Sequence, residues 1–154
     1  QRAPINTPLN AFKHVLQNQQ PQIGLWLGLA NAYTAEICAL AGFDWLLIDG
    51  EHAPNDLRTI LAQLQTIAAY PGNHAIARVP YGDAVLIKQY LDLGAQTLLV
   101  PMVDTAEQAA QLVRACRYPQ NDGGGGIRGM LQTTALAAQF KDVAVAPVKP
   151  GAVY

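Results

Sequence analysis

Apolar positions along this chain follow two alternating patterns. Short continuous apolar runs, typical of buried strands, stand at 22–28, 45–49, 75–79 and 97–100. Between them, apolar residues recur every three or four positions, as on one face of a helix, at 31–41, 55–69, 83–94 and 104–116. A further short helix is expected at 9–18, before the first strand. The pattern therefore predicts four successive strand–helix units of an α/β fold.

Residues that start and stop helices stand at the ends of these segments. Cap residues precede the helical segments, namely Asn31, Asn55 or Asp56, Asp83, and Asp104 or Thr105. Gly42 and Gly94 follow two of the helices as stops. The stretches 41–48 and 93–100 resemble each other, since each has a helix end, a glycine, two linker residues and an apolar strand. Repeated units of this kind imply a parallel sheet with right-handed crossovers.

Two architectures satisfy this repeat, a (β/α)8 barrel of the TIM type and a doubly wound sheet. A full barrel needs on the order of 250 residues, so a chain of 154 residues supplies about half of one. The pattern of strand–helix units ends at about residue 118. Beyond it lie the glycine run 123–126, a possible short helix at 135–140 and a possible short strand at 143–145. We expect one partial barrel domain over 1–154, with clear units over 9–117 and an atypical Gly-rich loop and tail over 118–154.

Composition and charge exclude several classes of partner. The net charge of −1 favours neither nucleic acid nor an anionic membrane surface. No apolar run approaches the roughly 20 residues of a membrane span, and no secretory signal is recognisable at the start of the sequence. Cys38 and Cys116 are far apart and fall in helical patterns, which indicates free thiols in a reducing compartment. We therefore predict a cytoplasmic protein.

The stretch Asp49-Gly50-Glu51-His52 carries the densest chemistry, directly after the second strand. Burying three ionisable side chains is costly unless they are paired, so the stretch is expected at the open end of a strand, where α/β proteins build their sites. His52 is either a solvated turn histidine or a general base that works near neutral pH. Asp49 and Glu51 are placed to orient it or to reach a metal ion, although a single histidine does not make a zinc site.

Three further residues are candidates. Arg78 ends the third strand, where its planar fork suits a carboxylate or a developing enolate oxygen; the alternative is a salt bridge to Asp83. Asp92 lies in the last turn of a helix, where a negative charge opposes the helix dipole, so it is either solvated or paired, for example with a histidine. The run 123–126 with Arg128 is either a flexible loop or a phosphate cradle, although it lacks the Lys-Ser/Thr of a P-loop.

Several segments taken together resemble the HpcH/HpaI aldolase family. They are PQIGLW (21–26), GFDWLLIDGEHAPN (42–55), IKQ (87–89), LLVPMV (98–103), RYP (117–119) and GIRG (126–129). The resemblance covers roughly residues 9–130. It implies a (β/α)8 barrel that assembles as a trimer or hexamer. It also implies a divalent metal ion (magnesium, manganese or cobalt) and reversible cleavage of 4-hydroxy-2-oxo acids into pyruvate and an aldehyde, so the expected partners are small-molecule 2-oxo acids and aldehydes.

The resemblance also implies roles for individual residues. His52 matches the catalytic base, Arg78 the arginine that stabilises the enolate, and Asp92 the acid that raises the basicity of the histidine. Asp49 matches an acid near the metal site, and Glu51 and Arg128 are expected near the substrate. A retro-aldol step needs a base for the hydroxyl proton and positive charge where the enolate forms, which agrees with these roles.

Two departures from the family pattern leave two interpretations open. The metal-binding Glu and Asp of the family lie on later strands, and no matching segment is found in this sequence; residues 131–154 do not match the continuation of the barrel. The chain is therefore either a metal-dependent aldolase whose missing half is supplied by assembly, or a non-catalytic half-barrel that acts as an assembly or binding module. In both cases we predict an open-edged sheet that associates, and not a closed monomeric barrel.

Overall fold

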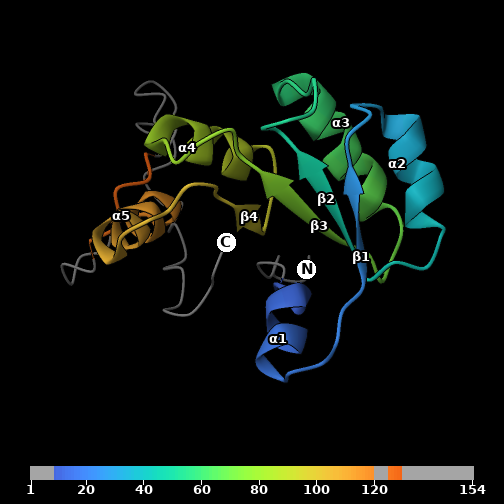
Figure 1. Ribbon diagram of the computed structural model, residues 1–154, viewed down its shortest axis with the longest axis horizontal. Coiled ribbons are helices and arrows are strands. Elements are labelled where there is room, and N and C mark those ends of the chain that lie inside the picture. The colour runs from blue at the N-terminus through green and yellow to red at the C-terminus, as the bar shows by residue number, and fades with distance from the viewer. Residues whose placement is uncertain (1–8, 120–124, 130–154) are drawn as a thin grey trace, which may run out of the picture.

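The computed structural model describes residues 9–119 and 125–129. A first helix is followed by four strand–helix units (Figure 1), as the sequence pattern predicts. The elements are α1 (Ala11–Gln17), β1 (Gly24–Leu27), α2 (Ala32–Ala39), β2 (Trp45–Asp49), α3 (Leu57–Ala68), β3 (His74–Arg78), α4 (Ala84–Asp92), β4 (Leu98–Leu99) and α5 (Ala106–Cys116). The elements expected at 135–140 and 143–145 lie outside the described residues.

The strands form one parallel sheet in the order β1-β2-β3-β4. A doubly wound sheet reverses direction part of the way along its strand order, whereas a barrel adds each new strand on the same side. The uninterrupted order is therefore that of a barrel wall. Within the described residues β1 and β4 each have a single neighbour, so this part of the sheet is open at both edges, as predicted.

One face of the sheet packs against helices. α2 and α3 lie side by side against it (Figure 1), and their apolar side chains join those of the strands in the main core. Leu46 and Ile48 of β2 and Ile60 of α3 have no exposed surface, and each such burial contributes about 1.5–3 kcal/mol. α1 lies below the starting ends of the strands (Figure 1), and its Phe12 packs against Leu47 and Ile76 on the opposite face.

Side-chain caps fix where the helices begin. Asn31 and Asp83 each accept backbone N–H groups at the start of α2 and α4. Where the sequence offered two caps, the structure uses Asp56 for α3 and Thr105 for α5, and both form reciprocal capping boxes. The cap residues fix the first residue of each helix. They thereby also fix the length of the loops that carry the ionisable residues.

Neither a membrane span nor a disulfide is found in the part of the chain that the structure describes. None of its helices is both long and apolar enough to cross a membrane. Cys38 and Cys116 are unpaired thiols, each partly buried, as the sequence predicted. Burial raises the pKa of the Cys116 thiol, and nearby arginines only partly offset this.

Candidate active site

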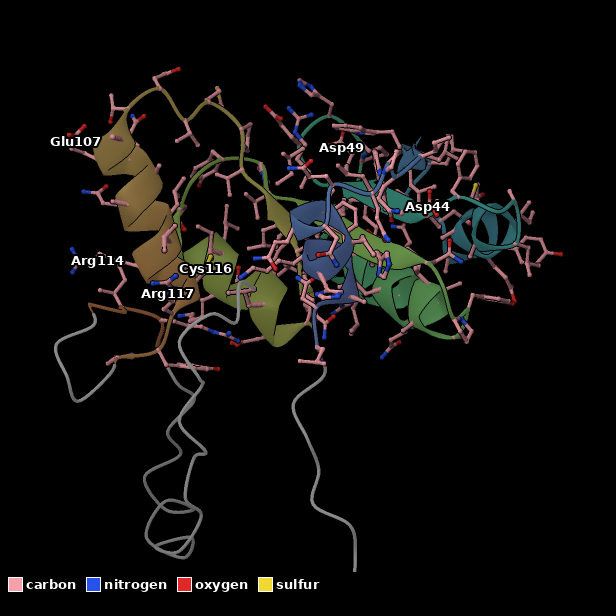
Figure 2. The ribbon with its side chains drawn as sticks, turned by 90° about the horizontal axis from the view of Figure 1, so that it is seen from below. Asp44, Asp49, Glu107, Arg114, Cys116 and Arg117 are labelled. Atoms are coloured by element: carbon pink, nitrogen blue, oxygen red, sulfur yellow. The ribbon has the colours of Figure 1, made fainter. Side chains whose placement is uncertain are left out.

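The site forms where β2 and β3 end side by side. Asp49, the last residue of β2, pairs in register with Arg78, the last residue of β3. Parallel strands end at the same edge of a sheet, so their terminal side chains meet there. Residues two apart on a strand share a face, so Asp49 lies on the face that bears Leu47, away from α2 and α3. Figure 2 shows Asp49 at this edge, with Asp44 at the other end of β2.

The Asp49 carboxylate is almost completely buried, and both of its oxygens accept hydrogen bonds. Its Oδ2 accepts the indole N–H of Trp26 at 2.8 Å, and its Oδ1 accepts the backbone N–H groups of Glu51 and His52 at 2.8 and 3.1 Å. Burial alone would raise the pKa of Asp49. These hydrogen bonds, together with the charge of Arg78, outweigh burial and hold the pKa below its ordinary value. Asp49 is therefore an anion at neutral pH.

Arg78 lies between two carboxylates and an indole ring. Its Nη1 is 3.6 Å from Asp49 Oδ2, its Nη2 forms an ion pair with Glu51, and its Cζ lies 5.5 Å from the centroid of the Trp26 ring. The alternative partner, Asp83, caps α4 instead. An arginine has five N–H donors, and the buried Nε of Arg78 has no hydrogen-bond partner among the described residues.

His52 is held by its backbone while its ring stays accessible. The His52 side chain is 74% exposed, and its Nε2 lies 3.7 Å from Glu51 Oε1. The backbone N–H of the same residue is bound to Asp49, so the loop is fixed even though the imidazole projects outward. Glu51 therefore stands between the two candidate groups, because its carboxylate faces both the imidazole of His52 and the guanidinium of Arg78.

Gly50 allows this loop to pass close to its neighbours. Its N–H donates to the carbonyl oxygen of Arg78 at 2.9 Å, and a Cβ at this position would collide with that oxygen and with the hydroxyl of Tyr90. Tyr90 is 3% exposed, and burial, with a further contribution from the Asp49 charge, raises its pKa to about 12. A neutral phenol therefore fills the space beneath the loop.

Two predicted site residues lie elsewhere. Asp92 is the last residue of α4, and its Oδ1 accepts a hydrogen bond from Arg128 Nη2 at 2.7 Å. Arg128 is 7% exposed, and its Cζ is 4.5 Å from the centroid of the Tyr118 ring. Within the described residues no hydrogen bond or ion pair joins Asp92 to His52. Of the two alternatives left open for Asp92, solvated or paired, the structure shows a pair, and the partner is Arg128.

This second cluster is well separated from the first. The backbone N–H of Arg128 donates to the carbonyl oxygen of Arg117 at 2.9 Å, and Figure 2 shows Arg117 well apart from Asp49. The guanidinium of Arg128 is bound to Asp92 and stacked on Tyr118, so its expected place near the substrate stays a prediction. Of the glycine run, 123 and 124 lie outside the described residues.

The described residues do not form a metal site. They contain no group of three or more His, Cys, Asp or Glu side chains placed to hold an ion. The two carboxylates nearest the candidate base, Asp49 and Glu51, both face Arg78. A cation bound between them would have to compete with the guanidinium, so these residues alone do not suit a divalent metal.

Sequence reasoning missed three residues that shape the site. Trp26 bonds Asp49, Tyr90 packs under Gly50, and the side chain of Asn55 donates to the carbonyl oxygen of Asp49 at 2.8 Å. For Trp26 a signal was present, since strand alternation in register with β2 places it on the same face as Asp49. Tyr90 matched the apolar face of α4, so nothing in the local pattern distinguished it from an ordinary core residue.

Comparisons with known proteins agree with this architecture. Residues 22–144 match the family model described as HpcH/HpaI aldolase/citrate lyase, so the match runs beyond residue 130, where the sequence analysis placed its end. A hydroxypyruvate/pyruvate aldolase of Deinococcus radiodurans is 65% identical over 134 residues, which are 87% of this chain and 47% of the relative. A 4-hydroxy-2-oxovalerate aldolase of Rhodococcus jostii is 64% identical over 126 residues, with coverage of 82% and 47%.

A solved structure shows the same fold. It is an HpcH/HpaI aldolase/citrate lyase family protein from Burkholderia cenocepacia, which superposes with a TM-score of 0.75 at 43% identity. The alignment covers 79% of this chain and 48% of that one. The chain thus spans about half the length of the curated relatives it matches.

Proposed function

Because the chain belongs to the HpcH/HpaI aldolase/citrate lyase family, we propose that it carries the base and the enolate-stabilising arginine of a carbon–carbon lyase. The proposed reaction is the reversible cleavage of 4-hydroxy-2-oxo acids into pyruvate and an aldehyde. The observation that carries the proposal is Arg78, an arginine at the open end of the sheet that lies between the carboxylates of Asp49 and Glu51 and against the loop that carries His52. A guanidinium fixed at such a position suits a ligand oxygen.

The reaction places two demands on the protein. A base removes the proton of the C4 hydroxyl, the C3–C4 bond breaks, and the aldehyde leaves while the electron pair becomes the enolate of pyruvate. The enolate carbon then takes up a proton at C3. His52 suits the first demand, since its exposed imidazole can accept a proton and stands beside the carboxylate of Glu51. Arg78 suits the second demand, because fixed N–H donors stabilise charge that develops on the C2 oxygen.

Asp49 and Glu51 have supporting roles in this proposal. Asp49 is ionised and holds both the loop and the indole of Trp26. Together with Glu51 it fixes the direction of the guanidinium before substrate arrives, and a preorganised cation costs no reorganisation during the reaction. We assign Asp92 no step in the site of this chain, because its carboxylate is bound to Arg128 in the separate cluster.

The divalent metal expected from the family takes no part in the proposed steps. The described residues do not supply its ligands, so the ligands of a magnesium, manganese or cobalt ion would come from elsewhere, and no step is routed through the ion. The homo-oligomeric state, trimer or hexamer, and the cytoplasmic location also remain proposals that rest on family resemblance and on the free thiols.

Pyruvate release tests the proposal. The chain is incubated with 4-hydroxy-2-oxo acids and with magnesium, manganese or cobalt, and pyruvate is followed over time. The matched control for the base is His14→Ala, because His14 is an exposed histidine of α1 at the other end of the sheet. We expect release that His52→Ala abolishes and His14→Ala does not. Equal release by both variants would remove His52 from the mechanism.

A second candidate, the non-catalytic assembly or binding module, is favoured by a different observation. On the sheet face opposite α2 and α3, Trp26 and Leu99 keep 47% and 38% of their surface exposed, and β1 and β4 have open edges within the described residues. Unpaired parallel edges and exposed apolar side chains drive association. Light scattering that shows association, without pyruvate release under any metal condition, would support this candidate over the lyase.

A further inference from the structure

The side chain of Asn55, which follows His52 in the sequence, closes the loop that carries His52 with a hydrogen bond. Nδ2 of Asn55 donates to the backbone carbonyl oxygen of Asp49 at 2.8 Å, which joins the end of the loop to its start. Inside the ring thus closed, the carboxylate of Asp49 accepts the N–H groups of Glu51 and His52. The short segment between β2 and α3 therefore has hydrogen bonds at both ends, although it belongs to no regular element.

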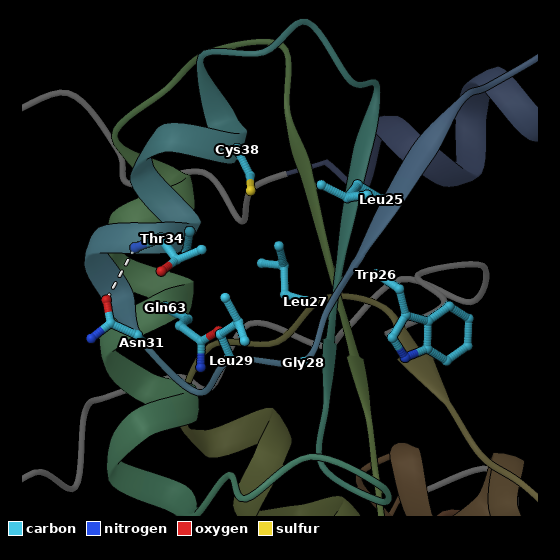
Figure 3. A pocket seen from close by; sticks show the side chains of 10 residues that line it. Leu25, Trp26, Leu27, Gly28, Leu29, Asn31, Thr34, Cys38 and Gln63 are labelled. Carbon is cyan, nitrogen blue, oxygen red and sulfur yellow. Dashed lines mark hydrogen bonds between the residues drawn. The ribbon is translucent and has the colours of Figure 1, made fainter.

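The side chain of Asn55 is in turn hydrogen-bonded to two residues of α3. Its Oδ1 accepts Nε2 of Gln63 at 2.7 Å and faces the hydroxyl of Thr59 at 3.0 Å. Gln63 is 1% exposed, and its Nε2 also donates to the carbonyl oxygen of Thr59 at 3.0 Å. Figure 3 shows Gln63 projecting from α3 into the pocket between β1 and α2, beside Leu29 and Thr34.

The direction of these hydrogen bonds is fixed by their acceptors. A backbone carbonyl can only accept, so the carbonyl of Asp49 requires the amide nitrogen of Asn55, and the carbonyl of Thr59 requires the amide nitrogen of Gln63. Turning either side-chain amide over would place oxygen against oxygen. The chain of donors therefore runs one way, from α3 through Asn55 to the end of β2.

We infer that Asn55 and Gln63 are positioning residues, which hold the His52 loop in the geometry that the proposed lyase reaction requires. Neither touches the imidazole or the guanidinium, so they act through the loop backbone. A fully buried glutamine in the middle of α3 is otherwise unexpected, because burying an amide is unfavourable unless its hydrogen bonds are made. The inference rests on the proposed function only for its effect on rate.

Amide hydrogen exchange tests the inference without requiring activity. In Asn55→Ala the tie to Asp49 is lost, and in Gln63→Leu the bulk of the side chain is kept while its donors are removed. We expect exchange at the N–H groups of Glu51 and His52 to rise by about tenfold or more in both variants. Amides in the middle of β2 should exchange as in the wild type, because their hydrogen bonds to β1 and β3 are untouched.

The matched control is Asn73→Ala. Nδ2 of Asn73 donates to the carbonyl oxygen of Ala39 at 2.9 Å, so this variant loses the same kind of hydrogen bond in a different loop. It should leave the Glu51 and His52 amides unchanged. The inference is overturned if those amides keep their wild-type protection in both test variants, or if they accelerate only in parallel with β2, which would mean a general role in stability.

A rate measurement separates this inference from the proposed function. If the wild type releases pyruvate, Asn55→Ala and Asn55→Asp should lower kcat by about 10- to 100-fold, with a KM change of less than about 3-fold, because misplacing a base impairs the reaction more than binding. Asn55→Asp keeps an acceptor for Gln63 but loses the donor to Asp49, so it should not restore the rate. If the wild type releases no pyruvate, the proposed function fails, while the exchange result still decides the role of Asn55.

Discussion

The molecule contains two arginine clusters of similar composition and different surroundings. Arg78 and Arg128 each pair with acidic side chains and each lie over an aromatic ring, Trp26 in one case and Tyr118 in the other. Arg128 makes a 2.7 Å hydrogen bond to one carboxylate and is 7% exposed. Arg78 is shared by two carboxylates, those of Asp49 and Glu51, at the ends of two neighbouring strands.

The surroundings of the two arginines explain the difference. Arg128 joins α4 to the segment after α5, where an arginine–carboxylate pair fixes two elements against each other. Arg78 stands at the ends of parallel strands, beside an exposed histidine. Strand ends at the carboxyl edge are where parallel α/β folds place their chemistry. An arginine–acid pair therefore indicates a site only when its position in the fold does so as well.

The largest expected effect comes from the base beside Arg78. In an assembly that releases pyruvate, His52→Ala should lower the cleavage rate by about 10²–10⁴-fold, the usual contribution of a positioned general base. The loop amide of residue 52 still binds Asp49 after this change, so the fold should be retained. Steady-state pyruvate release, with circular dichroism to verify folding, measures it. A well-folded variant with the wild-type rate would leave the Arg78 cluster without a base.

The next effect separates the two arginines directly. Arg78→Lys should lower the rate by about 10²–10³-fold, because an ammonium cannot reproduce the fork that serves two carboxylates and an enolate oxygen together. Arg128→Lys should change the rate per folded molecule by less than about 3-fold.

Arg58→Lys, at an exposed position of α3, is the matched control for a surface arginine. Equal losses of rate in the Arg78 and Arg128 variants would mean that the comparison between the clusters is wrong. Near-normal turnover in Arg78→Lys would show that only the charge at that position matters.

Sequence patterns bear differently on the two clusters, for a physical reason. Asp49 and Arg78 end neighbouring parallel strands, so periodicity and strand order bring them to one edge without any knowledge of side-chain packing. Asp92 and Arg128 meet across elements 36 residues apart in sequence, through the packing of α4 against α5. No periodic pattern encodes that contact, so the sequence alone could not predict it.

The same limit applies to the residues that hold the His52 loop. Gln63 lies in a strongly periodic helix, where the pattern distinguishes apolar from polar positions but not a solvated glutamine from a buried one. The partner of its amide is Asn55 in the loop after β2, and Asn55 in turn bonds the carbonyl oxygen of Asp49 at the end of β2. The family resemblance located the chemistry at residues 49–52, while the supporting contacts required the three-dimensional structure.

A stability measurement tests the role of the second cluster. Asp92→Asn removes the charge that faces Nη2 of the buried Arg128, and Asp92 is half exposed. The loss in the free energy of unfolding should be about 1–2 kcal/mol, between the ~0–1 kcal/mol of an exposed pair and the ~3–5 kcal/mol of a buried one. Urea unfolding measures it, with Glu107→Gln, an exposed acid of α5, as the control. A loss no larger than that of the control would mean that the pair does not hold α4 to its neighbour.

The smallest expected effect is a change in the pH dependence of the free energy of unfolding when Asp49 is replaced. Hydrogen bonds from Trp26 and the loop, helped by Arg78, hold its folded-state pKa below the ordinary value of 3.8 despite burial. A depressed folded-state pKa means that Asp49 contributes stability above pH 3.8, and that this contribution is lost as the pH falls through the folded-state value. Asp49→Asn should therefore be less stable than the wild type at neutral pH and should lose less further stability on acidification. Urea unfolding across this pH range measures both curves, and curves that stay parallel below pH 3.8 would show that the Asp49 carboxylate is not held as an anion by its neighbours.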